Sequence, residues 1–462
     1  MVGPTRETIL KTQSRRLGIL AFLVLAVLAG CGGGGGGGGG GPTTVTTVTI
    51  GGTISGLSGT VVLQNNGGDN LSRSVIGAFT FAGAVNSGSA YNLTVLTQPV
   101  GQTCTVSNGS GVAIANVTIV SVTCHALAVF FSADDGASGV ELWKTDGTDA
   151  GTVRVKDISP SATGSFPIQF AVFNGALYFA AADAAGDSEL WKTDGTDAGT
   201  VRVKDINPRV GGSFPIQFAV FNGALYFAAI DVAAGDEVWK TDGTDAGTVR
   251  LKDISPGAGS SSPFGFTVFN GALYFRASDG FSGAELWRTD GTDAGTVRVK
   301  DINPGAANSS PTGFTIFNGA LYFSAADATG GAELWRTDGT DAGTVRVKDI
   351  NPGAASSSPI GYTVFNGALY FRANEGVSSG LELWKSDGTD AGTVRVKDIN
   401  PGTGSSIPTG FTVFNGALYF QATDGVSGLE LWKSDGTDAG TVRVKDINPG
   451  AANSSPNGLT PF

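Results

Sequence analysis

The sequence predicts an all-β protein, in which a small β-sandwich precedes a seven-bladed β-propeller with four strands per blade, closed by its C-terminal strand. Glycine supplies 72 of 462 residues and only 15% are charged, a composition typical of strands joined by tight turns. A phrase close to ELWKTDGTDAGTVRVKDI occurs seven times, and its tryptophans recur every 48 or 49 residues. That period matches a four-stranded propeller blade.

Residues 1–30 are predicted to be a lipoprotein signal peptide. Four basic residues precede an apolar run of fourteen residues that ends at Gly30. A helix of that length spans only about 21 Å, which is less than the roughly 30 Å of a bilayer's hydrocarbon core. We therefore expect this segment to be removed rather than to remain as a membrane helix.

Leu28-Ala29-Gly30-Cys31 resembles the bacterial lipobox, whose cysteine is joined to a diacylglyceryl group and becomes the new N-terminus. The resemblance implies lipidation of Cys31, with residues 31–42 forming the anchor and a poly-glycine tether. Gly32, rather than aspartate, implies an exported protein on the outer membrane or cell surface. The alternative is an ordinary cleavage site beside an incidental cysteine.

Residues 43–125 predict the β-sandwich, because short runs rich in Val and Thr alternate with Gly, Asn and Ser clusters. This unit resembles the Ig-like modules found between anchor and head in bacterial surface proteins, which implies a spacer. Cys104 and Cys124 remain after lipidation, and an exported compartment permits their oxidation. We expect them to form a disulfide.

Residues 126–462 predict the propeller. In the fourth repeat its strands read GFTVF, ALYFRA, AELWRTD and TVRVKDI. The first two are apolar at successive positions, which favours strands covered on both faces, whereas the last alternates apolar and charged residues, which favours the outer edge. Asn-Gly between the first two strands indicates a type I′ hairpin turn. The seven tryptophans are expected in the core between blades.

The first repeat has no strand like GFTVF, and the chain ends with Leu459–Phe462, which has no strand after it. We expect these last four residues to become the innermost strand of the first blade and to close the ring. Pro461 cannot donate a backbone hydrogen bond, but an innermost strand has one unpaired side that tolerates it.

The seven phrases resemble the bacterial ELWxxDGT repeat family, and the match covers residues 126–462. One copy departs slightly, with Val238 in place of leucine. The resemblance implies an exported, propeller-like surface protein and does not by itself imply a reaction.

The candidate binding face carries the connections after the second strand and between blades, which vary among copies while the opposite turns do not. One acid per blade recurs there: Asp135, Asp183, Asp231, Asp279, Asp327, Glu375 and Asp424. Such a ring could attract Ca²⁺ or a cationic ligand, or each acid could simply bond to the backbone of its own turn. The densest acidic clusters are Asp183, Asp187 and Glu189 in the second repeat, and Asp231, Asp236 and Glu237 in the third.

No catalytic residues are predicted. His125 is the only histidine, so a Ser/His/Asp, Cys/His or histidine-metal site cannot be assembled. Hydrolysis by a carboxylate pair needs two acids in different environments, and near-identical blades supply no obvious odd pair. The net charge of −11 disfavours nucleic acid as a partner.

The sequence favours a non-enzymatic, lipid-anchored module that binds or adheres to a protein or glycan through its variable face. We expect a monomer that contacts the membrane through its lipid. No cofactor is assured, and Ca²⁺ is the one candidate. Two alternatives stay open: an envelope polysaccharide hydrolase or lyase, and a passive structural surface protein.

Overall fold

The computed structural model describes residues 46–160, 162–208, 211–376 and 380–461. The predicted signal peptide, Cys31, the glycine tether and Phe462 lie outside these residues. The described chain consists of strands and their connections, which confirms the all-β prediction. Within it, no helix is long and apolar enough to cross a membrane.

The first unit has two four-stranded sheets, β5-β2-β10-β8 and β4-β3-β7-β9, and a small β1-β6 pair. Its core includes Ile50, Leu63, Phe81 and Val122, which are fully buried or nearly so. Its strands are β1 (Thr47–Val48), β2 (Ile50–Ser55), β3 (Val61–Asn65), β4 (Asp69–Arg73), β5 (Gly77–Thr80), β6 (Val85–Asn86), β7 (Ser89–Thr97), β8 (Gln102–Ser107), β9 (Ser110–Ala113) and β10 (Val117–Ala126).

Cys104 and Cys124 form the expected disulfide, with an S–S distance of 2.00 Å. The two residues lie opposite each other in the antiparallel pair β8 and β10. The bridge therefore joins neighbouring strands of one sheet, directly before the chain enters the repeats.

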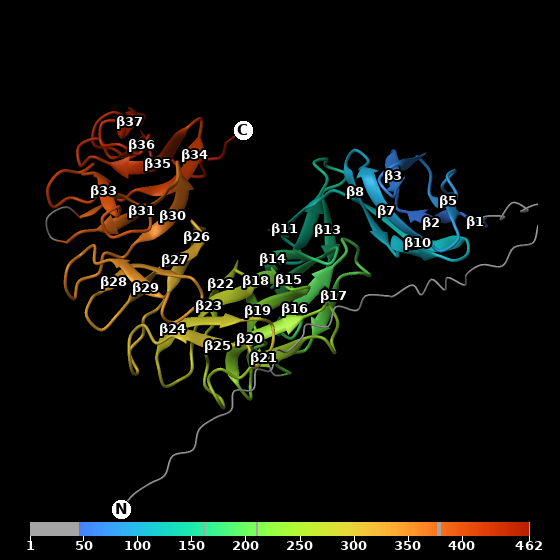
Figure 1. Cartoon of the computed structure of the whole chain (residues 1–462), viewed down its shortest axis with the longest axis horizontal. Coiled ribbons are helices and arrows are strands. Elements are labelled where there is room, and N and C mark those ends of the chain that lie inside the picture. The colour runs from blue at the N-terminus through green and yellow to red at the C-terminus, as the bar shows by residue number, and fades with distance from the viewer. Residues whose placement is uncertain (1–45, 161, 209–210, 377–379, 462) are drawn as a thin grey trace, which may run out of the picture.

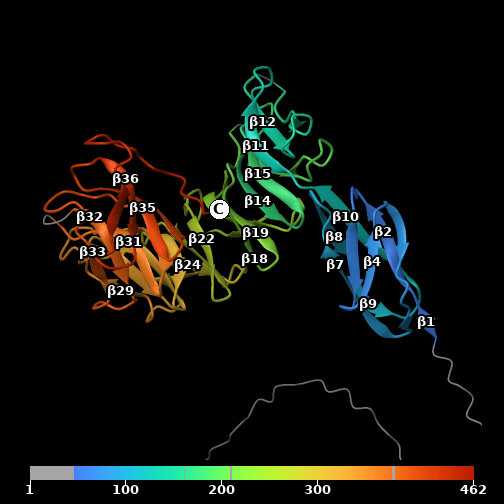
Figure 2. The same cartoon turned by 90° about the horizontal axis from the view of Figure 1, so that it is seen from above.

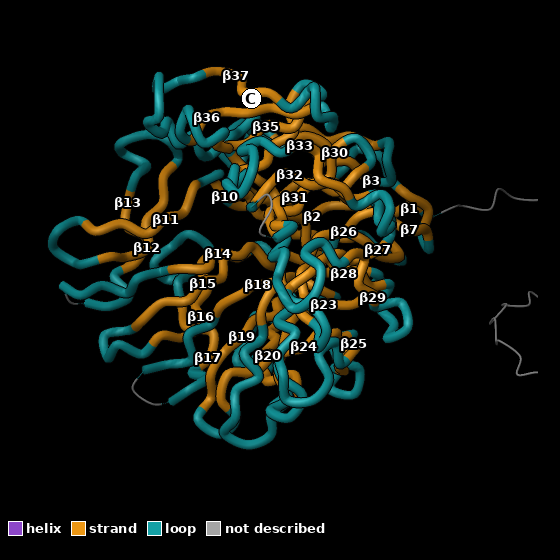
Figure 3. The backbone as a smooth tube through the Cα atoms, turned by 90° about the vertical axis from the view of Figure 1, so that its left-hand side faces the viewer, coloured by secondary structure: helices purple, strands orange, loops and turns teal. Residues whose placement is uncertain are grey.

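Seven sheets follow β10 along an arc, as Figures 1 and 3 show. Sheets two to seven each have four antiparallel strands in chain order, a propeller-like succession. The first strands are β14 (Ile168–Phe173), β18 (Ile216–Phe221), β22 (Phe264–Phe269), β26 (Thr312–Phe317), β30 (Ile360–Phe365) and β34 (Thr409–Phe414). The second strands are β11 (Val129–Asp134), β15 (Ala176–Ala182), β19 (Ala224–Asp231), β23 (Ala272–Ser278), β27 (Ala320–Ala326), β31 (Ala368–Asn374) and β35 (Ala417–Thr423).

In each of these sheets the third strand carries ELW or, in one case, EVW, and the fourth strand carries VRVK or, in one case, VRLK. The third strands are β12 (Val140–Thr145), β16 (Ser188–Thr193), β20 (Gly235–Thr241), β24 (Ala284–Thr289), β28 (Ala332–Thr337), β32 (Leu381–Ser386) and β36 (Leu429–Ser434). The fourth strands are β13 (Val153–Lys156), β17 (Val201–Lys204), β21 (Val249–Lys252), β25 (Val297–Lys300), β29 (Val345–Lys348), β33 (Val394–Lys397) and β37 (Val442–Lys445).

The Asn-Gly turns adopt the conformation that their sequence predicts. Asn270 and Gly271, for example, have φ angles of 45° and 71°, and the other five pairs are alike. Positive φ at both residues defines the type I′ turn, which joins first and second strands with the twist of the sheet.

Adjacent sheets pack face to face through one repeated apolar contact. Between the third and fourth sheets, Phe221, Tyr226 and Val238 meet Leu273, Phe275 and Trp287. Six of the seven tryptophans are 4–8% exposed in such contacts, which confirms their core role. Burying an aromatic side chain of this size stabilises by several kcal/mol, so packing between sheets holds the arc together.

Among the residues that the structure describes, the predicted closure is not formed. The first sheet has only the three strands β11-β12-β13, and Leu459–Pro461 form no strand. Instead, the carbonyl oxygen of Leu459 accepts a hydrogen bond of 3.0 Å from Thr412 Oγ1 on β34. The tail thus lies against the last sheet, and Figures 1 and 2 show the last sheet standing apart from β11. Pro461 also removes one donor that a regular strand would use.

Candidate functional site

The seven predicted acids occupy equivalent turns, and each already has partners in its own sheet. The amides of Ser138 and Ala137 both bond to Asp135, and these bonds lower the pKa of that carboxyl. Each acid also faces the arginine of its fourth strand, in the pairs Asp135–Arg154, Asp183–Arg202, Asp231–Arg250, Asp279–Arg298, Asp327–Arg346, Glu375–Arg395 and Asp424–Arg443. A cation at any of these positions would have to compete with a guanidinium group.

The second sheet departs from this pattern because it has an additional acid. Asp187, just before β16, stands where every other repeat has glycine: Gly139, Gly235, Gly283, Gly331, Gly380 and Gly428. Its Oδ2 atom lies 3.3 Å from Arg202 Nη1. Asp183 and Asp205 contact the same guanidinium at 3.7 and 3.3 Å.

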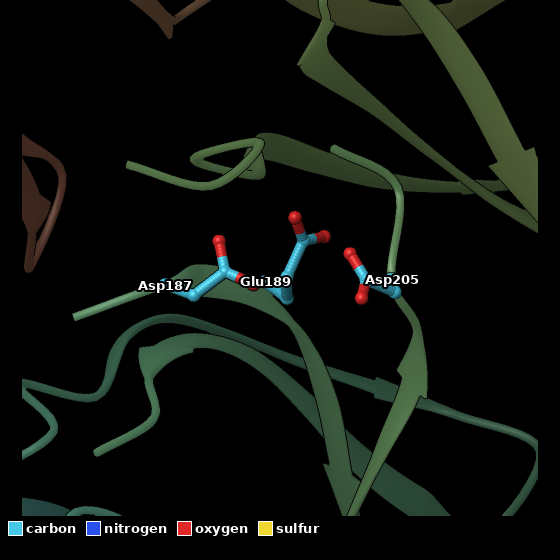
Figure 4. A group of neighbouring side chains, drawn as sticks. All are labelled: Asp187, Glu189 and Asp205. Atoms are coloured by element: carbon cyan, nitrogen blue, oxygen red, sulfur yellow. The ribbon is translucent and has the colours of Figure 1, made fainter. Parts of the chain in front are cut away.

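Figure 4 shows the resulting group, with Asp187, Glu189 and Asp205 turned toward one another. One carboxylate oxygen from each of these three lies within 4.8 Å of those of the other two. We call Asp183, Asp187, Glu189 and Asp205 the acidic group of the second sheet. Three of these carboxyl groups, those of Asp183, Asp187 and Asp205, lie within 4 Å of the Arg202 guanidinium. In this arrangement the charged form of one acid disfavours the charged form of the next.

Asp187 and Asp205 have different surroundings. Asp187 is 8% exposed, and its Oδ1 atom has no hydrogen-bond partner among the described residues. Burial raises the pKa of Asp187, and the neighbouring Asp205 and Asp183 raise it further, against the opposing effect of Arg202. Asp205 is exposed. The second sheet therefore supplies the odd pair of acids that the sequence analysis did not find.

Glu189 has a structural role that all seven repeats share. It accepts hydrogen bonds from the amides of Ile206 and Asn207 and from the Ser213 hydroxyl. The equivalent glutamates are all 0% exposed: Glu141, Glu237, Glu285, Glu333, Glu382 and Glu430. Sequence analysis missed this role, although an acid recurring on a strand covered on both faces was a usable signal.

The acidic cluster of the third repeat does not form a comparable group. Asp231 pairs with Arg250 at 3.0 Å, while Asp236 has no ion pair among the described residues. Burial raises the pKa of Asp236 to about 6 and that of Glu237 to about 7. Glu237 is held by the same kind of bonds as Glu189.

No protein-family model matches the chain. No curated protein matches it either. Among solved structures, it is similar to a puromycin hydrolase at 13% identity and a TM-score of 0.39, over 70% of this chain and 52% of that one. It is also similar to a structure from a study of two prolyl endopeptidases, at 14% identity and a TM-score of 0.42, over 68% and 48%.

A third similar structure is a puromycin-hydrolyzing peptidase from Mycobacterium tuberculosis, at 11% identity and a TM-score of 0.37, over 72% and 53%. The chain spans about half the length of each of these proteins. All three are named as hydrolytic enzymes, which differs from the expected non-enzymatic binding or adhesion module. The alternative of a hydrolase agrees with them better. At this similarity, none of their substrates or catalytic residues is carried over.

Proposed function

We propose that this protein is a hydrolase that cleaves glycosidic bonds in an envelope polysaccharide at the acidic group of the second sheet. The observation that carries the proposal is Asp187, a buried acid at a position that is glycine in the other six repeats, with one oxygen that has no hydrogen-bond partner in the described part of the chain. A residue that breaks an otherwise repeated pattern, and whose pKa is perturbed, is a candidate for function rather than folding.

The chemistry assigns different roles to the two unlike acids. Asp187, whose pKa is raised, donates a proton to the glycosidic oxygen as the leaving sugar departs. The exposed carboxylate of Asp205 attacks the anomeric carbon and forms a glycosyl ester. Water, deprotonated by Asp187, then displaces the ester and regenerates both groups.

The spacing supports this division of roles. The oxygens of Asp187 and Asp205 approach within 4.8 Å. Enzymes that retain anomeric configuration place their two carboxyl groups about 5 Å apart, whereas inverting enzymes leave room for a water between them. Arg202 holds both carboxylates in place through its two terminal nitrogens.

We also propose the setting in which the site works. The repeated sheets support a seven-bladed propeller of the ELWxxDGT kind, completed by the C-terminal residues. The order of basic residues, apolar run and cysteine supports an exported monomer anchored through Cys31 on the outer membrane or cell surface. No cofactor is assigned to the reaction.

The test compares wild-type protein with Asp187→Gly in an assay for new reducing ends on a panel of envelope polysaccharides. Glycine is the residue of the other repeats, so this variant should fold normally. We expect activity to fall by at least about a hundredfold, the range of general acid catalysis. The matched control is Asp279→Asn, a turn acid of the fourth sheet, which should keep wild-type activity. Equal activity of Asp187→Gly and wild type would refute the site.

A further inference from the structure

The two ends of the arc expose surfaces that are buried everywhere else in it. We propose that the end face of the last sheet is the docking surface for the end face of the first sheet of the same chain. The face of the last sheet consists of Phe414, Tyr419, Leu431, Val444 and Ile447. The face of the first consists of Val129, Phe131, Ala133 and Trp143. This inference concerns assembly and does not depend on the proposed reaction.

The contacts between neighbouring sheets inside the arc show which residues would meet in this docking. Between the sixth and seventh sheets, Phe365, Tyr370, Leu383, Val396 and Ile399 pack against Leu418, Phe420, Ala422 and Trp432. The pairing registers of β11 with β12 and of β35 with β36 show that Val129, Phe131, Ala133 and Trp143 are the counterparts of that second set. The two end faces thus carry the two halves of one more such contact.

The side chains of the two end faces are more exposed than their counterparts between neighbouring sheets. Val444 and Ile447 are 44% and 49% exposed, whereas Val396 and Ile399 are 7% and 3% exposed. On the first sheet, Val129 is 65% exposed, and Trp143 is the one tryptophan that is not buried. Apolar side chains exposed in this way indicate a contact surface.

Charge at the two ends is complementary as well. Each internal contact includes an ion pair of 2.7–2.9 Å between the last lysine of one VRVK or VRLK strand and an aspartate in the next sheet. The pairs are Lys156–Asp197, Lys204–Asp245, Lys252–Asp293, Lys300–Asp341, Lys348–Asp390 and Lys397–Asp438. By the same repeat positions, the seventh pair is Lys445 with Asp149, and neither has an ion pair within the described residues.

The tail follows the path of the linkers that lead from one sheet into the first strand of the next. Ser454 bonds to Glu430 through its amide at 3.1 Å and its hydroxyl at 2.8 Å, as the linkers between sheets do. Ser455 and Gly458 have φ angles of 46° and 62°, close to the 50° and 70° of their counterparts Ile407 and Gly410. The tail and the end face of the last sheet enclose a cavity of about 320 Å³.

The occupant is the first sheet of the same chain rather than that of a second copy. Linkage through one chain gives the two faces a high effective concentration. Docking between copies would be head to tail, so every open chain of copies would still expose one face of each kind. Docking within the chain buries both faces at once.

The test is zero-length cross-linking of the full chain with a carbodiimide, which joins a lysine to a carboxylate in direct contact. Equal amounts of ¹⁴N- and ¹⁵N-labelled protein are mixed, and cross-linked peptides are identified by mass spectrometry. We expect a Lys445–Asp149 link in peptides of a single isotope, at a yield similar to the internal Lys397–Asp438 link. Lys445–Asp149 links of mixed isotope would show that a second copy is the occupant and would overturn the proposal. A failure to find any Lys445–Asp149 link while Lys397–Asp438 links form would also overturn the proposal.

A variant of the docking surface gives an independent result. Ile447 is half exposed in the open arc, so Ile447→Asp should leave the seven sheets folded. We expect this variant to lose the Lys445–Asp149 link at least tenfold and to keep the Lys397–Asp438 link unchanged. An unchanged Lys445–Asp149 yield would show that the apolar end face does not hold the first sheet.

Discussion

The carboxylate of Glu285 accepts a hydrogen bond of 2.6 Å from the hydroxyl of Ser309, 24 residues later in the chain. The same carboxylate accepts bonds from the amides of Ile302 and Ser309 at 2.8 and 2.9 Å. Glu285 thus fastens the ELW strand of one sheet to the connection that leads into the next. Because the arrangement recurs in all seven repeats, it fixes the path of the chain from each sheet into the next.

Replacing this glutamate should destabilise the protein strongly. In Glu285→Ala, two buried amides and one hydroxyl lose their acceptor, and each costs about 1–3 kcal/mol when left unsatisfied. We expect a loss of at least 2 kcal/mol in the free energy of unfolding, measured by urea denaturation. Asp293→Ala removes an aspartate that is 72% exposed and serves as the control, with a change below about 1 kcal/mol.

Stability should fall as the pH rises from about 4.5 to about 7. Burial raises the pKa of Glu237 and of Glu382 to about 7 in the folded protein, from an ordinary value of 4.5. Between these values the folded state holds more protons than the unfolded state, so each added pH unit disfavours folding. Thermal unfolding should therefore give a higher Tm at pH 5 than at pH 8.

The variants Glu237→Gln and Glu382→Gln test whether these two glutamates cause the pH dependence of stability. Glutamine keeps an acceptor oxygen and cannot ionise, so the double variant should show a smaller change of Tm between pH 5 and pH 8. If the two pH profiles coincide, these glutamates do not govern the pH dependence.

A tryptophan packed between two sheets should contribute more to the free energy of unfolding than the tryptophan at the end of the open arc. Trp287 is 7% exposed and packs against Phe221, Tyr226 and Val238 of the preceding sheet. Trp287→Ala should cost about 3–5 kcal/mol of unfolding free energy. In the open arc Trp143 has no preceding sheet, so Trp143→Ala should cost clearly less there, and a cost equal to that of Trp287→Ala would be a sign of closure.

The disulfide should stabilise the sandwich rather than the repeats. Cys104 and Cys124 are 20 residues apart, and cross-linking a loop of that size contributes about 3 kcal/mol in the chain-entropy model. We expect the Cys104→Ser and Cys124→Ser double variant to lower the unfolding transition of residues 46–126 selectively. Hydrogen exchange followed by mass spectrometry separates the two units, and equal loss of protection in both would contradict this assignment.

The repeated strands and turns were predictable because the local sequence of each repeat specifies them. Asn270-Gly271 specifies its hairpin through positive φ, and Trp287 marks a strand covered on both faces. The buried role of Glu285 was missed, since its partners lie 17 and 24 residues later and depend on the packed linker. The constant serine of each linker belongs to this framework, although the linkers were read as variable surface.

The site was harder to predict than the fold. Asp187, Asp205 and Arg202 are separated in sequence and meet only after β16 and β17 pair. The acid of each variable turn looked more prominent in the sequence, but each is bound by its own turn and by an arginine. The usable signal was Asp187, the single acid at a position that is glycine in the other repeats. This difference becomes plain only when the repeats are aligned by their folded turns.

The most direct test of the proposed reaction is the anomeric configuration of the first product, followed by proton NMR during hydrolysis of a defined oligosaccharide. Carboxylate oxygens within 4.8 Å of each other predict that the configuration is retained. An inverted product would contradict the roles given to Asp187 and Asp205, and an unsaturated sugar end would show elimination instead of hydrolysis.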